Sequence, residues 1–121
     1  MPNKPYAQEW FAIVLRNFET AKLLYRHGHY TDIIGIEIQQ AVEKALKTIL
    51  AYHNQKIPRD HDLVKLAAFV KPWVIFSQEE LEQLRIITDY YKDDRYPNPR
   101  YFIPLSEEIS QALEFSEKLI D

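Results

Sequence analysis

Apolar residues recur every three or four positions along almost the whole chain, and this spacing constrains the fold more than any other feature. Such spacing places apolar side chains on one face of a helix, whereas a half-buried strand alternates apolar and polar residues. In the first segment the repeat comprises Phe11, Val14, Phe18, Ala21 and Tyr25. It predicts an amphipathic helix over residues 7–26, which Gly28 ends in a short turn.

A second helix is predicted over residues 31–53. Its start is rich in isoleucine, which also favours strands, but the alanines and charged residues beyond Gln40 favour a helix. Its apolar stripe comprises Ile34, Ile38, Ala41, Ala45 and Ile49, widened by Val42, Leu46 and Leu50. This is the longest helix that the sequence predicts.

Capping residues and prolines mark three further helices. Asp60 is placed to cap a short helix over residues 61–70, and Pro72 stops it. Ser77 and Glu80 form a capping box that opens the next helix. The apolar face of that helix comprises Leu81, Leu84, Thr88 and Tyr91. Pro104 suits the first turn of a last helix. The apolar face of this last helix comprises Ile109, Ala112, Phe115 and Leu119.

The order of these segments predicts the fold class, because no strand, internal repeat or low-complexity segment interrupts them. We predict a single all-α domain over residues 1–121. Its architecture should be an antiparallel four-helix up-and-down bundle with one short additional helix.

The composition agrees with one folded domain and excludes several classes of function. The length of 121 residues is enough for one core, and a net charge of −3 is not that of a polycation that binds nucleic acid non-specifically. Two glycines argue against a glycine-rich phosphate loop, and the absence of cysteine excludes disulfides and thiolate metal sites. No signal segment or membrane span of about 20 apolar residues is present, so we expect a cytoplasmic protein.

The predicted helix over residues 31–53 carries a polar face beside its apolar stripe. This face comprises Gln40, Glu43, Lys44 and Lys47, spaced three and four residues apart. One interpretation is a solvated face with a Glu43–Lys47 ion pair that stabilises the helix by about 0.2–0.5 kcal/mol. The other is a polar rim beside a cleft or a partner helix.

His61 and Asp62 stand where the short helix should begin. His61 can cap that helix or pack against the helix over residues 31–53. It can also serve a binding site, because an imidazole changes its charge near neutral pH. No carboxylate stands at metal-ligand spacing around the other histidines, which are His27, His29 and His53. We therefore expect no metal and no other cofactor.

The stretch DYYKDDRYPNPRYF, residues 89–102, combines four tyrosines with two arginines and two prolines. Its first part, as far as Arg95, should continue the preceding helix, and the two prolines then impose extended backbone. Arg95 and Arg100 carry planar guanidinium groups suited to phosphate. Tyr96 offers a ring on which a base can stack, and Tyr91 shares a helix face with Arg95.

A structural interpretation of the same stretch is equally open. The aromatic side chains can form a loop that covers the end of the bundle. The arginines then pair with the neighbouring aspartates, Asp93 and Asp94.

Three motifs, in this order, resemble the minimal HEPN domain, a nucleotide-binding domain of higher eukaryotes and prokaryotes. They are QQAVEKALK at residues 39–47, HDL at 61–63 and YYKDDRYP at 90–97. The resemblance extends over nearly the whole chain. It implies a helical bundle that forms a homodimer. It also implies a separately encoded minimal nucleotidyltransferase as the partner, often in a toxin–antitoxin pair.

Many HEPN proteins are metal-independent ribonucleases, and the resemblance implies where their signature should lie. In that signature an arginine holds the phosphate, and a histidine four to six residues beyond it helps to activate or orient the ribose 2′-hydroxyl. Here neither Arg95 nor Arg100 is followed by a histidine in that window. Loss of a general base costs about 10²- to 10⁴-fold in rate.

We therefore predict a non-catalytic HEPN protein that binds a nucleotide, RNA or a nucleotidyltransferase in a toxin–antitoxin-like module, without membrane association. The candidate binding residues are Lys44, Lys47, His61, Tyr91, Arg95, Tyr96 and Arg100. No residue is assigned a catalytic role. One alternative is a metal-independent ribonuclease in which His61 replaces the missing histidine. Another is a purely structural dimer whose apolar faces bury a partner.

Overall fold

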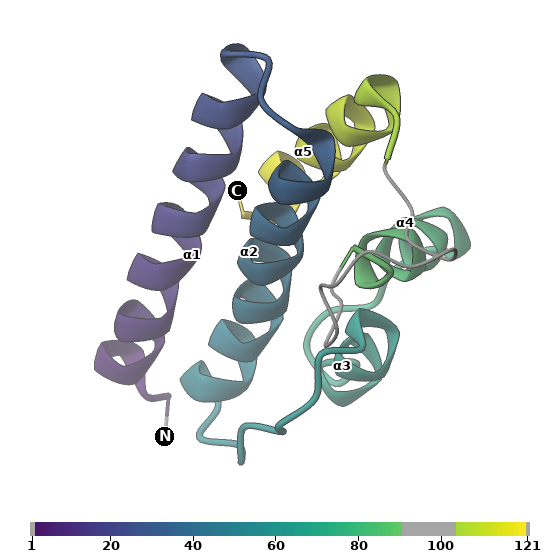
Figure 1. Ribbon diagram of the computed structural model, residues 1–121. Coiled ribbons are helices and arrows are strands. Elements are labelled where there is room, and N and C mark those ends of the chain that lie inside the picture. The colour runs from purple at the N-terminus through teal and green to yellow at the C-terminus, as the bar shows by residue number, and fades with distance from the viewer. Residues whose placement is uncertain (1, 91–103, 121) are drawn as a thin grey trace.

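The computed structural model describes residues 2–90 and 104–120, and these form five helices without a strand (Figure 1). The helices are α1 (Lys4–Arg26), α2 (Thr31–Tyr52), α3 (Leu63–Phe69), α4 (Gln78–Thr88) and α5 (Ser106–Ile120). Four longer helices and the short α3 confirm the predicted all-α class with one short additional helix. None of the described helices is long and apolar enough to cross a membrane.

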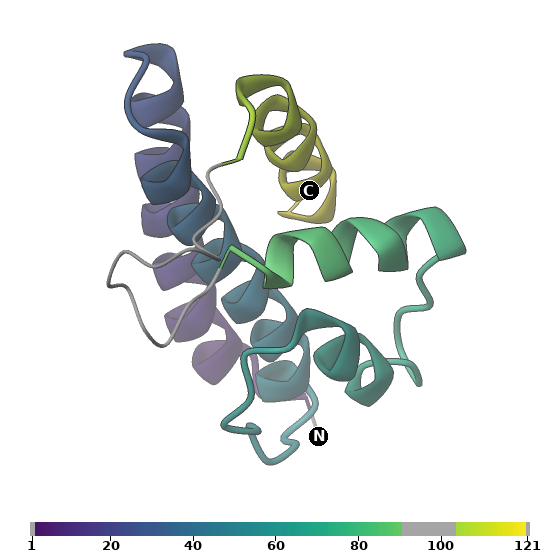
Figure 2. The same ribbon diagram turned by 45° about the vertical axis from the view of Figure 1, so that its right-hand side comes forward.

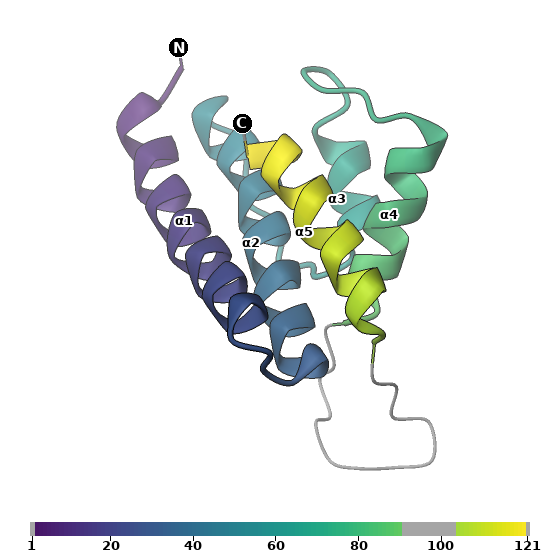
Figure 3. The same ribbon diagram turned by 90° about the horizontal axis from the view of Figure 1, so that it is seen from above.

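Helix α2 is the centre of the bundle, because it contacts each of the other four helices. Figure 1 shows α1 antiparallel to α2 at its side. Seen from above in Figure 3, α5 lies next to α2 on the side that faces α4. Figure 2 shows α4 running obliquely across the direction of α1 and α2. Both polar and apolar positions of α2 are therefore covered by neighbouring elements.

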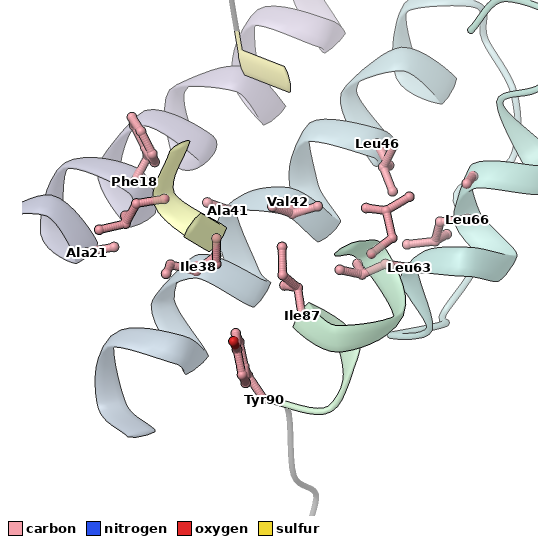
Figure 4. Close-up of a cluster of buried hydrophobic side chains, with 14 of the residues drawn as sticks. Phe18, Ala21, Ile38, Ala41, Val42, Leu46, Leu63, Leu66, Ile87 and Tyr90 are labelled. Atoms are coloured by element: carbon pink, nitrogen blue, oxygen red, sulfur yellow. The ribbon is translucent and has the colours of Figure 1, made fainter. Parts of the chain in front are cut away.

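The apolar stripe of α2 forms the middle of one hydrophobic core. Ile38, Val42 and Leu46 are completely buried, and Figure 4 shows Ile87 of α4 between Val42 and Tyr90 in the same core. The core also receives residues from every other helix, among them Phe18, Ala21, Leu63, Leu66 and Ile109. The helical periodicity of the sequence thus identified the core residues of α2 correctly, but on α4 it omitted Ile87, which is completely buried.

Helix α1 begins at Lys4, three residues before the predicted start. Asn3 is its N-cap, and its side-chain Oδ1 accepts a hydrogen bond of 3.3 Å from the Tyr6 amide. The Asn3 side chain also donates to Asn54 Oδ1 at 2.9 Å. These contacts bind the start of α1 to the turn that follows α2.

Helix α3 begins at Leu63 and not at residue 61, because Asp62 rather than Asp60 is its N-cap. The Asp62 carboxylate accepts hydrogen bonds from the amides of Val64 and Lys65. Asp60 instead accepts from the Asp62 amide at 2.9 Å, which shapes the turn before the helix. The prediction that Asp60 caps the helix was wrong by two residues, and this shift leaves His61 outside the helix.

Helix α4 begins as predicted but ends earlier. Its capping box is present, with Ser77 Oγ accepting from the Glu80 amide at 3.1 Å and Glu80 Oε1 accepting from the Ser77 amide at 2.8 Å. The helix ends at Thr88, and Asp89 and Tyr90 form a turn. The expected continuation of the helix is therefore wrong at Tyr90, while residues 91–95 lie outside the described part of the chain.

The packing of Tyr90 gives the physical reason for this early end. The Tyr90 side chain is 5% exposed, and its hydroxyl donates to Glu108 Oε2 at 2.7 Å. Its ring lies against Gly35 of α2, where a methyl group would come within 3.0 Å of Tyr90 Cγ. Burying the ring against α2 and α5 stabilises the turn in place of a further helical turn.

Pro104 lies before α5 and not in its first turn, since α5 begins at Ser106. Pro104 is buried, and its carbonyl oxygen accepts a hydrogen bond of 2.6 Å from the Thr31 hydroxyl at the start of α2. This contact holds the backbone at Pro104 against α2. The sequence predicted Pro104 in the first turn of the last helix, but that helix begins two residues later, at Ser106.

Candidate functional site

Three side chains of α2 are buried although each carries a charged or an amide group. Gln39, Glu43 and Lys47 follow one another by one helical turn and are 0%, 3% and 6% exposed. The predicted Glu43–Lys47 ion pair is present, with Lys47 Nζ donating to Glu43 Oε2 at 2.9 Å. The solvated-face interpretation is wrong for this pair, because both side chains are buried.

His61 comes from that connection and contacts the buried pair. Its Nδ1 lies 2.8 Å from Glu43 Oε1. Gln39 Nε2 donates both to Glu43 Oε1 at 3.0 Å and to the backbone carbonyl of His61 at 3.2 Å. Helix α2 therefore holds His61 by its ring and by its backbone, while 46% of the His61 side chain stays exposed.

Lys44 joins the same network through two amide side chains. Its Nζ donates to Gln40 Oε1 at 2.6 Å, and Gln40 Nε2 donates to Gln39 Oε1 at 2.7 Å. Lys44 is partly buried. A continuous path of hydrogen bonds thus runs from Lys44 to Glu43 and His61. We call the group Gln39, Gln40, Glu43, Lys44, Lys47 and His61 the α2 polar cluster.

The α2 polar cluster keeps Glu43 ionised. Burial by itself would raise the pKa of Glu43, but hydrogen bonds from Lys47, Gln39 and His61, together with the charge of Lys47, outweigh burial and hold the pKa below its ordinary value. An ionised carboxylate accepts hydrogen bonds and donates none. The His61 Nδ1 that faces Glu43 must therefore carry a proton.

Burial also lowers the pKa of the Lys44 ammonium. The neighbouring Lys47 lowers it further, while the carboxylates of Glu43 and Glu37 oppose both effects. An additional anion beside Lys44 would favour its charged form for the same reason.

The structure brings together three of the residues predicted for binding, Lys44, Lys47 and His61. Lys44 and His61 lie at the edge of the α2 polar cluster, whereas the ammonium of Lys47 is enclosed and paired with Glu43. The other predicted binding residues, Tyr91, Arg95, Tyr96 and Arg100, lie outside the described residues.

Sequence reasoning missed Gln39 and the contact between Glu43 and His61. The spacing of four residues from Gln39 to Glu43 and from Glu43 to Lys47 shows that the three side chains share a face. It does not show that the face is covered. Within residues 2–90 and 104–120, no group of three or more His, Cys, Asp or Glu side chains is arranged to hold a metal ion.

Comparison with known proteins identifies the family. The model of the HEPN domain matches residues 7–121. The crystal structure of TT1696 from Thermus thermophilus is similar, with a TM-score of 0.80 and 24% identity over 94% of this chain and 92% of that one. ST0689, an archaeal HEPN homologue, gives a TM-score of 0.72 and 18% identity over 94% and 91%.

The two structural likenesses support the fold, and the search of curated proteins found no match. The family match extends over almost the entire chain and agrees with the order of the three sequence motifs. This chain belongs to the HEPN domain family.

Proposed function

We propose that this HEPN protein binds a phosphate-bearing ligand, a nucleotide or RNA, beside the α2 polar cluster without cleaving it. The observation that carries the proposal is the convergence of Lys44 and His61 on one buried carboxylate. Glu43 holds His61 at 2.8 Å, and Gln39 and Gln40 link Lys44 to the same group. The cluster thereby offers cationic and imidazole groups in fixed positions, which lowers the entropy cost of binding.

The roles of the candidate residues differ. Lys44 contacts phosphate, and His61 contacts a neighbouring group of the ligand. Lys47 supports them by neutralising Glu43, since its ammonium is buried in the 2.9 Å ion pair. The proposal also retains Arg95 and Arg100 as phosphate ligands from the sequence. Tyr91 and Tyr96 complete the candidate set as stacking residues.

The proposed setting follows the resemblance to HEPN proteins. The protein acts in the cytoplasm as a homodimer that pairs with a minimal nucleotidyltransferase in a toxin–antitoxin-like module. The absence of a histidine at the signature distance from Arg95 and Arg100 favours a binding role over cleavage.

Fluorescence anisotropy with a labelled 15-nucleotide oligoadenylate, and competition with ATP, test ligand binding. Lys44→Ala should weaken RNA binding about 3- to 10-fold. It should also reduce the slope of log affinity against log salt by about 0.7, because one phosphate contact is lost. Lys118→Ala is the matched control, as Lys118 is an exposed lysine on α5. Absence of binding at micromolar protein, or equal losses in both variants, contradicts the proposal.

Two further measurements address the partners. Light scattering of the purified chain should give the mass of a dimer. Co-expression with a nucleotidyltransferase encoded beside it should give a complex that survives size-exclusion chromatography. A monomer that leaves the nucleotidyltransferase unbound would contradict this part of the proposal while leaving ligand binding to its own test.

The Glu43–His61 contact favours a second candidate function, a metal-independent ribonuclease. A carboxylate bound to Nδ1 orients an imidazole so that its other nitrogen can take a proton from a hydroxyl group. This function predicts RNA cleavage in the presence of EDTA, abolished by His61→Ala. Intact RNA after long incubation with the pure protein excludes it.

A further inference from the structure

A groove between α4 and α5 is separate from the α2 polar cluster, because none of its lining residues belongs to that cluster. Its walls are the end of the connection from α3 to α4, the first two turns of α4 and the second half of α5. Figure 3 shows this connection and the C-terminal end of α5 at the same end of the bundle. The groove has a volume of about 520 Å³, which lies in the range of clefts that bind ligands.

The floor of the groove is apolar and remains open to water. Val74, Phe76, Phe115 and Leu119 pack against the hydrophobic core but are only partly buried. Ile75 adjoins them and has 76% of its surface exposed. Burial of exposed apolar surface is favourable, and an exposed apolar groove edged by polar residues is typical of an interaction site. The floor therefore favours an occupant with an apolar face.

The rim of the groove is acidic, with Glu79, Glu80 and Glu114 against one cation, Lys118. Lys118 Nζ lies 3.8 Å from Glu114 Oε1, and both side chains are mostly exposed, so this ion pair leaves most of the negative charge open to a partner. The acidic excess extends beyond the rim. Helices α4 and α5 together carry seven glutamates against one arginine and one lysine, a net charge of −5, whereas the whole chain has −3. This side of the molecule therefore attracts a cationic partner and repels an anionic one.

We propose that the groove between α4 and α5 binds a basic amphipathic helix of a partner protein. Such a helix carries its apolar side chains on one face, and these enter the groove, while lysines or arginines at its flanks face the glutamates of the rim. The acidic rim repels phosphate, so nucleic acids and anionic membrane surfaces are poor occupants. The inference does not depend on the proposed function, because it concerns other residues and another class of ligand.

Fluorescence anisotropy with a designed peptide tests the groove directly. The probe is a labelled helix of about 14 residues with leucine on one face and lysine on the other. Its counterpart carries glutamate in place of every lysine and keeps the same apolar face. The lysine peptide should bind at micromolar concentration, and the glutamate peptide should bind at least about 10-fold more weakly. Equal binding of the two peptides, or no binding of the lysine peptide, overturns the inference while the proposed function stands.

Two double variants of equal net charge test whether the charges of the rim are responsible. Glu79→Gln with Glu114→Gln removes two carboxylates from the rim and should weaken binding of the lysine peptide about 3- to 10-fold at low salt. Glu82→Gln with Glu117→Gln removes two carboxylates from the same helices outside the groove and should change the affinity less than about 2-fold. Equal losses in the two double variants show that the rim has no local role and overturn the inference.

The apolar floor has its own pair of variants. Ile75→Ser should weaken binding of the lysine peptide about 3- to 10-fold without loss of thermal stability, because Ile75 is mostly exposed. Leu105→Ser is the control, since Leu105 is 72% exposed, lies outside the groove and should not affect the affinity. Light scattering tests a second copy of the chain as the occupant. A dimer that dissociates in Ile75→Ser assigns the groove to the dimer contact and overturns the inference.

Discussion

Glu43 on α2 and Glu82 on α4 each accept hydrogen bonds from a cationic side chain about one turn further along the helix, but their surroundings are opposite. Glu43 and Lys47 have side chains only 4% and 7% exposed. Glu82 and Arg85 are 58% and 56% exposed, although Arg85 Nη2 lies 2.7 Å from Glu82 Oε1. The shorter contact belongs to the exposed pair, so distance alone does not rank the two pairs in importance.

The difference lies in what each pair does for its neighbours. Water can replace either partner of the Glu82–Arg85 pair, and solvent screening leaves it little net effect. Water has little access to Glu43, so every donor around it must be supplied by the protein. The buried pair therefore fixes the positions of Gln39 and His61, and the exposed pair fixes nothing beyond its own helix.

The largest expected effect comes from removing one member of the buried pair. Glu43→Ala leaves the ammonium of Lys47 buried without a counter-ion and should lower the free energy of unfolding by about 3–5 kcal/mol. Glu82→Ala should give no measurable change. Urea denaturation of both variants measures these changes. Similar losses of unfolding free energy in the two variants would show that burial does not distinguish the two ion pairs.

Removing both members of the buried pair sharpens the same comparison. Glu43→Leu combined with Lys47→Met leaves no uncompensated charge and should recover most of the stability that Glu43→Ala loses. His61 should nevertheless lose its fixed tautomer in the double variant. A double variant as unstable as Glu43→Ala would show that the amide and imidazole partners of Glu43, rather than the charge of Lys47, dominate the effect.

The Tyr90–Glu108 hydrogen bond is an intermediate case, with one buried and one partly exposed member. Burial raises the pKa of Tyr90 strongly, and the carboxylate of Glu108 adds to this, so the tyrosine stays protonated and donates. Tyr90→Phe keeps the ring against Gly35 and should lower the free energy of unfolding by about 1 kcal/mol. Thermal unfolding checks the value, and a loss as large as that of Glu43→Ala would contradict the ranking by burial.

The smallest expected effect is a dependence of the free energy of unfolding on pH in the acid range. The pKa of Glu43 is lowered in the folded protein, so the folded state favours the carboxylate. That contribution is present above the ordinary glutamate pKa of 4.5 and is lost as pH falls through the lower folded value. Between pH 6 and pH 4 the unaltered protein should therefore lose slightly more stability than the Glu43→Leu, Lys47→Met double variant. If the urea midpoints of the two proteins change equally with pH across this range, the prediction is contradicted.

The sequence predicted most of the fold because helix positions depend on local spacing and local caps. The stripe from Ile34 to Leu50 gave α2 to within one residue, and Ser77 with Glu80 gave the start of α4. The errors at Asp60, Tyr90 and Pro104 share a cause. Each of these positions depends on the exact course of a connection or on contacts with a distant element, which local spacing does not contain.

The candidate site was predicted as a set of residues but not as an arrangement. Lys44, Lys47 and His61 were expected to lie near one another because they belong to motifs of one family. That Glu43 would bind His61 depends on how the connection from α2 to α3 packs onto α2. The burial of Lys47 likewise depends on tertiary packing. Burial of a polar face is a tertiary property, since the same spacing of charges occurs between Arg85 and the C-cap Asp89 on the exposed face of α4.

The contacts of Tyr90 and Pro104 have a consequence for protein engineering. Tyr90 rests on Gly35, and Pro104 accepts from Thr31, one turn earlier on α2. Two segments of the chain therefore depend on one turn of α2. An engineered variant should keep Gly35 and Thr31, because a larger side chain at Gly35 or loss of the Thr31 hydroxyl would release one of these segments from α2.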